Sequence, residues 1–403
     1  MTKINKKVMI TIVLLTASAC LICAMSDGIK NNYGIMLNSI IENSGLTYSY
    51  VSLVLAVGQL FYGIMQPTFG VLAEKKGNTL TLLIGVSLTL IGLVLLPKCT
   101  NAFLLMLILG FFLPAGTGAT SYGILIGSIS PKIPAKTVSL VSGFVNASSG
   151  VGNALLSPII TYFLNKGGLA AAMFILIIPT LIMIPLCFYI GRKQGSEEVE
   201  SVEKKETSVV DQFKDALSNR SYQLLMVGFF TCGFHMALIS NHLPSQIVSY
   251  GITSQTSSYA FSVYGIITML GSVFSGYLCG RLIHKNVLGT YYGSRSIITI
   301  IFLLLPKNLI TIFGYAALLG MTGAATVPPV TSIINDEFGA DRLASLYGFV
   351  FFIHSIGGFL GAWLAGICVD YFGGYVLIWI VDIVLSAIAA IASYAIKPLD
   401  IKA

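Results

Sequence analysis

The chain alternates long apolar stretches with short polar breaks. Each stretch holds about twenty residues, the length that an α-helix needs to cross the hydrocarbon core of a bilayer. Lipid offers no hydrogen-bond partners, so a spanning segment must be a helix or a strand of a closed barrel. Barrel strands alternate apolar and polar residues over about ten positions, whereas residues 102–113 read AFLLMLILGFFL without alternation. The pattern therefore predicts transmembrane helices.

The apolar pattern predicts twelve spans, at 8–37, 48–73, 79–97, 102–129, 138–164, 169–191, 221–247, 256–282, 287–305, 309–334, 342–369 and 374–396. The segment between the sixth and seventh spans mixes both charge signs with few aromatic residues, which is typical of a solvated linker. Within it, Val209–Leu217 is predicted to form a short amphipathic helix at the surface. We expect an all-α membrane protein with an N-terminal six-helix bundle (1–191), a cytoplasmic linker (192–220) and a C-terminal six-helix bundle (221–403).

The two halves of the chain share short motifs at a common spacing. GVLAEKKG at Gly70–Gly77 is answered 206 positions later by GYLCGRLIHK at Gly276–Lys285. The triplet TGA at Thr117–Ala119 returns 205 positions later at Thr322–Ala324. Matches at one offset, in order along both halves, indicate two like-oriented, pseudo-symmetric bundles. Transporters built this way bind their solute at the interface of the repeats, and we expect the site there.

Composition and charge agree with a membrane protein. Hydrophobic residues make up 55% of the chain and charged residues 10%, whereas soluble domains are about a quarter charged. With both termini inside, eighteen of the 23 Lys and Arg residues lie on the cytoplasmic side, which fixes the orientation in the plasma membrane. The net charge of +7 is therefore a topology signal, and no nucleic-acid partner is expected.

The N-terminus and the cysteines each have a second interpretation. Three lysines followed by an apolar run to Cys20 resemble a lipoprotein signal, but the chain stays apolar beyond Cys20, which favours a first transmembrane helix. The seven cysteines have no metal-ligand spacing and are interpreted as small buried hydrophobes. No phosphate-binding loop, nucleophile elbow or dinucleotide fingerprint occurs in the sequence. We expect no metal, no cofactor and no enzymatic activity.

Over nearly its whole length the chain resembles the major facilitator superfamily. Gly70-x-x-x-Glu74-Lys75-x-Gly77 is similar to that family's loop motif between helices two and three. The resemblance implies that Gly70, Glu74 and Lys75 help to latch a cytoplasmic gate. The second copy keeps Gly276 and Arg281 but has a glycine where an acid would lie. The family's proton-antiporter signature on helix five is not matched.

Within the superfamily the chain is most similar to the monocarboxylate-porter and oxalate/formate branch. The residues that carry this resemblance are the run ENSGLT at Glu42–Thr47, then Ser52, and Gln66-Pro67-x-x-Gly70. The resemblance implies a monocarboxylate or a related organic anion as the solute. The branch's arginine on helix eight would fall near Ser272, which is not basic. Its basic residue on helix one would fall beside Lys30.

Four formally charged residues fall at membrane depth, where each needs a partner or water. Asp27 and Lys30 are i,i+3 neighbours on helix one and can pair. In a functional interpretation, Asp27 and Lys30 lie with Asn31 on a stripe that faces the cavity. In a structural interpretation, the two charges only neutralise each other and do not bind a solute. For Arg295 and Asp382, on helices nine and twelve, we favour a structural bridge. Alternatively, Arg295 binds an anion through its fork of donors.

Three histidines at membrane depth could carry a coupling proton, because histidine titrates near physiological pH. In the alternative, each is bonded to a neighbouring carbonyl. The candidate substrate-binding residues are Lys30, Asn31, Tyr33, Tyr122, Asn146, Ser149, His235, Arg295, Tyr347 and His354, and the candidate proton-coupling residues are Asp27, His235, His242 and His354.

Small residues and prolines predict where helices approach closely or break. Gly- and Ser-rich faces on helices four, five, eight and eleven allow close helix packing. Pro328 and Pro329 in helix ten remove two backbone donors and are expected to bend or unwind it. Such breaks in transporters border the cavity.

The leading hypothesis is a monomeric secondary transporter that moves a small organic solute across the lipid bilayer by alternating access. If the four charges at membrane depth pair, their sum is zero, so an incoming monoanion needs a proton to balance it. Proton–anion symport follows, with Lys30 holding the carboxylate. Two alternatives stay open: efflux of amphiphilic compounds with Asp27 as the coupling acid, and a receptor that binds without transport.

Overall fold

The computed structural model describes residues 6–192 and 209–397, and these residues contain helices and turns but no strand. The chain divides into two compact units. Unit 1 comprises Met1–Leu46 and Phe61–Val202, and unit 2 comprises Thr47–Leu60 and Glu203–Ala403. Helix α3 (Tyr48–Lys76) contributes to both. The predicted division at 192–220 stays a prediction, because most of that segment lies outside the described residues.

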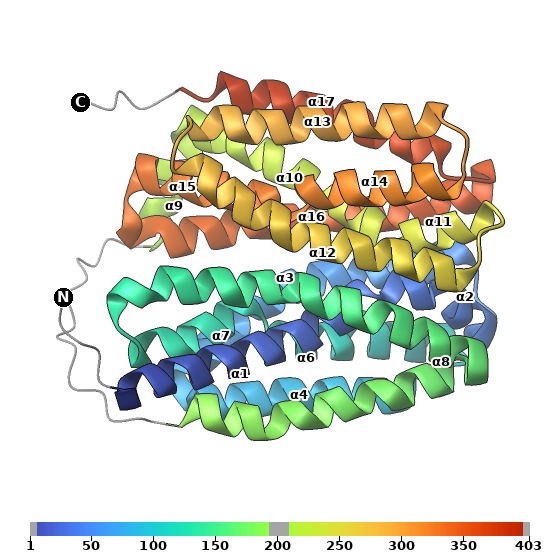
Figure 1. The fold of residues 1–403 in the computed structure, drawn as a ribbon, viewed down its shortest axis with the longest axis horizontal. Coiled ribbons are helices and arrows are strands. Elements are labelled where there is room, and N and C mark those ends of the chain that lie inside the picture. The colour runs from blue at the N-terminus through green and yellow to red at the C-terminus, as the bar shows by residue number, and fades with distance from the viewer. Residues whose placement is uncertain (1–5, 193–208, 398–403) are drawn as a thin grey trace. The chain divides into compact units, whose positions relative to one another are not determined.

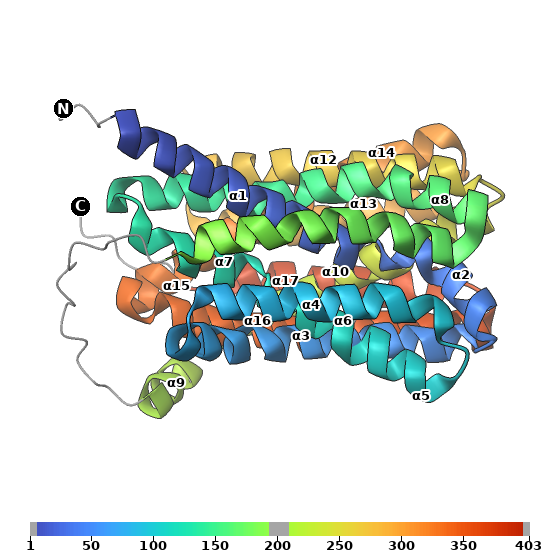
Figure 2. The same cartoon turned by 90° about the horizontal axis from the view of Figure 1, so that it is seen from below.

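Unit 1 is built from helices that pack around an apolar core supplied by α1, α3, α4, α6, α7 and α8. Helix α8 lies against both α1 and α4 (Figures 1 and 2). Unit 1 contains residues 61–76 of α3. Its other elements are α1 (Lys6–Asn31), α2 (Tyr33–Ser44), α4 (Asn78–Leu95), η1 (Leu96–Lys98), α5 (Ala102–Leu105), the π-helical turn η2 (Met106–Phe112), α6 (Leu113–Ala119), α7 (Tyr122–Ile129), η3 (Ser130–Lys132) and α8 (Ala135–Gly191).

Unit 2 packs around a second core, and α13 lies alongside α17 (Figure 1). Unit 2 contains residues 48–60 of α3. Its other elements are α9 (Val209–Ser218), α10 (Arg220–Asn241), α11 (Leu243–Ser249), α12 (Ser254–Cys279), α13 (His284–Leu304), α14 (Leu309–Thr322), η4 (Ala324–Thr326), α15 (Val327–Phe338), α16 (Ala340–Phe372) and α17 (Val376–Ala395). Helix α9 confirms the helix predicted in the linker, and its Ala216 is fully buried in the core of unit 2.

The prediction of twelve membrane spans is confirmed. Eleven helical stretches of the described chain are long and apolar enough to cross a membrane. The longest, Leu140–Gly191, is interrupted at Gly167 and Gly168, which have non-helical backbone angles. Gly168 has a φ of +63°, a conformation that glycine adopts without a steric cost. This stretch is therefore two spans joined by a turn.

Within each unit, two helices approach each other closely at a glycine. A Cβ atom on Gly152 of α8 would lie 1.8 Å from the carbonyl oxygen of Ala24 on α1. A Cβ atom on Gly233 of α10 would lie 1.8 Å from the carbonyl oxygen of His354 on α16. The same pair of helices, the first and fifth of each half, thus uses the same device for backbone contact.

Two pairs of breaks recur in the two units. The first span of unit 1 is interrupted at Asn32, between α1 and α2, and the first span of unit 2 at His242, between α10 and α11. The fourth spans are interrupted between α6 and α7 and at Gly323, after α14. The predicted single helix at 8–37 is therefore two helices. The break expected near Pro328 is confirmed, a few residues before the prolines.

Candidate functional site

In unit 1, the predicted pair on helix α1 forms. Lys30 Nζ lies 3.9 Å from Asp27 Oδ1 and 3.9 Å from the centroid of the Tyr62 ring. The Cys23 thiol donates to Asp27 Oδ2 at 3.6 Å. The Lys30 and Asp27 side chains are 18% and 13% exposed. A fixed cation on an aromatic face, with limited access to solvent, can hold an anionic group.

The break after α1 brings further polar groups next to this pair. Asn32 Nδ2 donates to the carbonyl oxygen of Gly28 at 2.6 Å and to Oδ1 of Asn153 on α8 at 3.1 Å. Tyr33 is buried, and its hydroxyl has no hydrogen-bond partner among the described residues. Asn31 is half-buried. The break therefore lies among buried polar side chains, next in sequence to the Asp27–Lys30 pair.

The other predicted residues of unit 1 lie on α7 and α8. The hydroxyls of Tyr122 and Ser142 are hydrogen-bonded to each other. Asn146 and Ser149 are half-buried on α8. Whether these side chains contact a solute stays a prediction.

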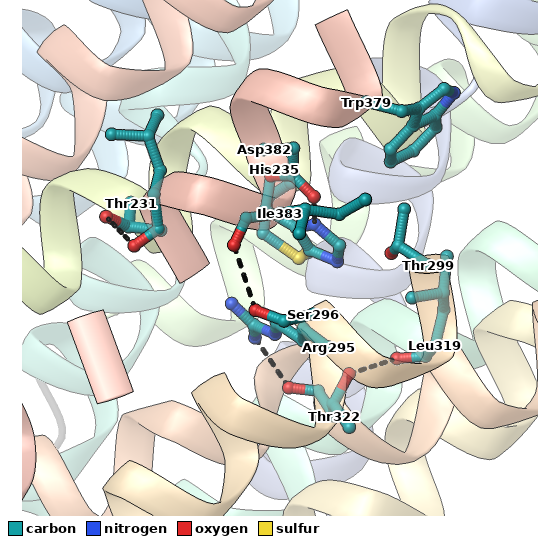
Figure 3. Close-up of polar contacts among 12 residues, drawn as sticks. Thr231, His235, Arg295, Ser296, Thr299, Leu319, Thr322, Trp379, Asp382 and Ile383 are labelled. Carbon is teal, nitrogen blue, oxygen red and sulfur yellow. Dashed lines mark hydrogen bonds and ion pairs between the residues drawn. The ribbon is translucent and has the colours of Figure 1, made fainter. Parts of the chain in front are cut away.

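Unit 2 contains a fully buried imidazole–carboxylate pair. His235 Nδ1 lies 2.8 Å from Asp382 Oδ2, and neither residue is exposed to solvent. Because an ionised carboxylate only accepts, Nδ1 carries the hydrogen. His235 Nε2 and Asp382 Oδ1 have no hydrogen-bond partner among the described residues. Figure 3 shows the pair between α10 and α17, with Arg295 beside it.

The predicted Arg295–Asp382 bridge is wrong. Arg295 Nη2 instead donates to the carbonyl oxygens of Thr322 and Gly323, at 2.6 and 2.8 Å, and Asp382 pairs with His235 (Figure 3). The physical reason is the helix break at Gly323, which frees backbone oxygens that attract a cation. Arg295 is fully buried, and its Nε and Nη1 atoms have no partner among the described residues.

The remaining candidate histidines differ in their surroundings. His242 donates from Nε2 to the carbonyl oxygen of Ala362 at 2.8 Å, and its Nδ1 lies 3.1 Å from the Tyr48 hydroxyl. Because a carbonyl only accepts, Nδ1 of the neutral ring accepts from Tyr48. His354 stacks on Phe351, with 5.1 Å between ring centroids, and its Nδ1 has no partner among the described residues. Tyr347, one further candidate, is half-buried on the same helix.

The residues of the two loop motifs lie at helix ends. Gly70 is half-buried in α3, Lys75 is exposed, and the Glu74 side chain lies outside the described residues. Gly276 and Arg281 are exposed, and Arg281 lies 4.4 Å from the centroid of the Tyr277 ring. Their role as a latch stays a prediction.

Sequence reasoning missed several groups of the unit 2 cluster. The Cys232 thiol lies 3.2 Å from the Thr326 hydroxyl, and Ser296 donates to the carbonyl oxygen of Ile383 at 3.0 Å. The repeated triplet at Thr322–Ala324, just before two prolines, was the available signal for the carbonyls that Arg295 binds. Among the described residues, no group of three or more His, Cys, Asp or Glu side chains could hold a metal ion.

Comparison with known proteins identifies one family of membrane transporters. Residues 19–307 and 247–402 match the model of the Major Facilitator Superfamily. The chain is 21% identical over 385 residues to the oxalate:formate antiporter of Oxalobacter formigenes, covering 94% of this chain and 88% of that protein. It is 24% identical over 319 residues to monocarboxylate transporter 12 of Xenopus laevis, covering 73% and 68%. A crystal structure of a D-xylose-proton symporter superposes with a TM-score of 0.75 at 15% identity, covering 97% of this chain and 98% of that one.

Proposed function

Because the chain belongs to the Major Facilitator Superfamily and is an integral membrane transporter of small solutes, we propose that it moves a small organic carboxylate together with a proton by alternating access. The buried His235–Asp382 pair is the observation that carries the proposal, since it offers a proton a site away from water. The names of the two relatives, which refer to oxalate, formate and monocarboxylates, support the substrate class.

A proton needs no cavity, so a packed imidazole–carboxylate pair can bind one. Without the coupling proton, neutral His235 donates to ionised Asp382, and the pair carries one negative charge. The added proton goes to His235 Nε2 or Asp382 Oδ1, the two atoms of the pair that have no partner among the described residues. The pair then has no net charge. Histidine is the side chain best suited to this change near neutral pH.

Charge balance links the proton to the solute. The four charged residues at membrane depth, Asp27, Lys30, Arg295 and Asp382, sum to zero. Leaving one added charge unpaired in a low-dielectric interior is costly. A monoanion that enters with one proton keeps the total at zero, whereas a monoanion alone does not. Cotransport of one proton with each monoanion is therefore favoured.

Lys30 is the proposed anion-binding group. Its 3.9 Å distance to Asp27 Oδ1 exceeds the usual 2.7–2.9 Å of a charge-assisted hydrogen bond, so the ammonium keeps donors for a carboxylate. Arg295 is less suitable for the solute, because it is fully buried and already holds two carbonyls. The excess of Lys and Arg in predicted cytoplasmic segments supports a plasma-membrane protein with both termini inside the cell, and we propose that it acts as a monomer.

Uptake into proteoliposomes tests the proposal. Labelled formate, oxalate, acetate and lactate are offered with and without an imposed pH gradient, acidic outside. We expect at least one of these acids to accumulate faster with the gradient than in protein-free liposomes under the same gradient, and a protonophore to remove the increase. Lys30→Gln is expected to abolish binding and uptake, because its neutral amide cannot balance a carboxylate.

A matched pair of histidine variants tests the proton site. His235→Gln is expected to lose the dependence on the gradient. His242→Gln is the control and should keep it, because both nitrogens of His242 already have partners in the backbone and Tyr48. Uptake without any effect of the gradient would remove the proton from the proposal. Export of amphiphilic cations, or binding without flux, would replace it with one of the two alternatives.

A further inference from the structure

The fourth span of unit 2 has a break whose backbone oxygens need donors from outside the helix. After Thr322, the backbone of Gly323 leaves the helical conformation, with φ −53° and ψ −84°. The amide of Val327 donates to Ala324, not to Gly323 as in a regular α-helix. Pro328 and Pro329 have no amide hydrogen to give. Carbonyls around the break must therefore find other partners or remain unsatisfied.

Side chains from neighbouring helices supply these donors. Arg295 Nη2, on α13, donates to the oxygens of Thr322 and Gly323 at 2.6 and 2.8 Å. The Ser275 hydroxyl, on α12, donates to the oxygen of Ala325 at 2.5 Å. A single guanidinium nitrogen thus binds both carbonyls where the helix is interrupted.

The same guanidinium has a second potential partner. Its Nε and Nη1 atoms and the Oδ1 atom of Asp382 are buried and have no hydrogen-bond partner among the described residues. Asp382 lies at the same level of the neighbouring helix, since the next residue on each helix is bonded: Ser296 donates to the oxygen of Ile383 at 3.0 Å (Figure 3). A carboxylate and a guanidinium fork form a strong two-point contact when they meet.

We propose that Arg295 is a positioning residue that exchanges between the carbonyls of the break and the Asp382 carboxylate, so that the shape of the break depends on whether the His235–Asp382 pair holds a proton. The proposal rests on that pair being the coupling site. It adds the element through which the proton acts on the helix.

The direction of the exchange follows from charge. When the pair holds the proton, its net charge is zero, and the carbonyl oxygens of Thr322 and Gly323 are the better partners for Arg295. When the proton leaves, the pair carries one negative charge, and the nearest fixed cation moves toward it. The carbonyls of Thr322 and Gly323 then lose their donor, and the break loosens. Two discrete arrangements biased by one proton are what a switch requires.

Other titratable groups also surround Arg295 and Asp382. They are Cys232 on α10, Tyr264 on α12, Tyr292 on α13 and Tyr315 on α14, and His354 on α16 lies next to Cys232. Of these, Cys232 and His354 have the side chains whose titration could imitate that of the pair. Variants Cys232→Ser and His354→Gln test this alternative. The pH dependence of exchange described next should persist in both, and its loss in either variant would overturn the assignment to the His235–Asp382 pair.

Hydrogen–deuterium exchange of peptides covering residues 318–334 tests the proposal on the full-length protein. Rates are corrected for the intrinsic effect of pH on amide exchange and compared at about pH 5.5 and about pH 8, on either side of the usual histidine range. We expect exchange around the break to be about ten- to a hundredfold faster at the higher pH, the factor that corresponds to losing a charge-assisted hydrogen bond.

Two variants should shift this exchange in opposite directions. Asp382→Asn removes the competing carboxylate charge, so exchange around the break, measured relative to the rest of unit 2, should be slow at both pH values. Arg295→Lys keeps the buried charge, so the protein can fold, but a single ammonium cannot replace the fork. Its exchange should be fast at both pH values. Asp370→Asn, an exposed acid on α16 that accepts from the Ser49 amide, should behave as the wild type.

The outcomes separate this proposal from the transport function. A purely structural Arg295 would make both variants exchange faster at every pH, and that result would overturn the proposal. So would wild-type exchange around the break that is independent of pH in a protein that performs gradient-driven uptake. Absence of uptake alongside pH-dependent exchange would instead reject the proposed function and leave the switch standing.

Discussion

The most direct physical test of the unit 2 cluster is to remove its charges singly and together. Asp382→Asn weakens the 2.8 Å contact with His235, and a hydrogen bond to a charged group contributes about 1.5–3 kcal/mol. It also leaves the fully buried Arg295 without a nearby carboxylate. Leaving a buried charge without compensation costs about 3–5 kcal/mol, and we expect Asp382→Asn to cost about this much. That is a large share of the 5–15 kcal/mol typical of a folded protein.

Arg295→Gln is expected to cost a similar amount, for two reasons. The carbonyls of Thr322 and Gly323 lose their donor, and Asp382 loses its nearby cation. The double variant leaves no net charge in the cluster, so it should be more stable than the sum of the single costs predicts. We expect a coupling energy of about 2 kcal/mol, within the range seen for residues in one network.

Reversible chemical unfolding in detergent measures these free energies for the wild type, the two single variants and the double variant. The comparison requires that the free energy of unfolding has the same dependence on denaturant concentration in all four proteins. A matched control is the ion pair of Arg342 and Asp215, at 2.8 Å but 34% and 64% exposed. Exposed pairs contribute about 0.2–1 kcal/mol, so the control cycle should give a much smaller coupling. Single costs below about 1 kcal/mol, or costs that add within about 0.5 kcal/mol, would refute the assigned electrostatic network.

Two further predictions concern packing and hydrogen bonding. Gly152→Ala should prevent close contact of α8 with α1 and strongly lower the yield of folded protein, because a Cβ atom would lie 1.8 Å from the Ala24 oxygen; Gly143→Ala, with nothing within 4 Å, is the control in a size-exclusion assay. Tyr48→Phe removes a hydroxyl that lies 3.1 Å from His242 Nδ1 and should lower the free energy of unfolding by about 0.5–1.5 kcal/mol. An unchanged elution profile for Gly152→Ala, or unchanged stability for Tyr48→Phe, would contradict the respective contact.

The apolar pattern was sufficient to predict the spans, because a membrane-length run has few alternatives in lipid. It also located the turn between the fifth and sixth spans, where Gly167 and Gly168 interrupt α8. The breaks at Asn32 and His242 could not be predicted in this way. Asparagine and histidine are compatible with a helix interior, and only the packed neighbours determine that the backbone is interrupted there.

The candidate site was predictable where it is local. The Asp27–Lys30 pair depends on i,i+3 spacing alone, and it forms. The partner of Asp382 depends on how far α10, α13 and α17 are rotated about their axes, which composition does not determine. The sequence therefore identified the buried charged residues but paired Asp382 with Arg295, when its partner is His235.

The two units use different donors for the backbone oxygens at the equivalent breaks of their fourth spans. This difference favours the break of unit 2 as the place where the proton acts. Between α6 and α7, the Thr120 hydroxyl lies 3.2 and 3.4 Å from the carbonyl oxygens of Gly116 and Thr117 and is bonded to the Ser26 hydroxyl at 2.7 Å, so neutral groups meet the polar demand. In unit 2, the equivalent break is held by Arg295, a permanent charge. A buried permanent cation requires a compensating anion, and Asp382 provides one whose charge a proton can cancel. A titratable switch therefore has a physical basis at the break of unit 2 that the neutral hydroxyls of unit 1 do not provide.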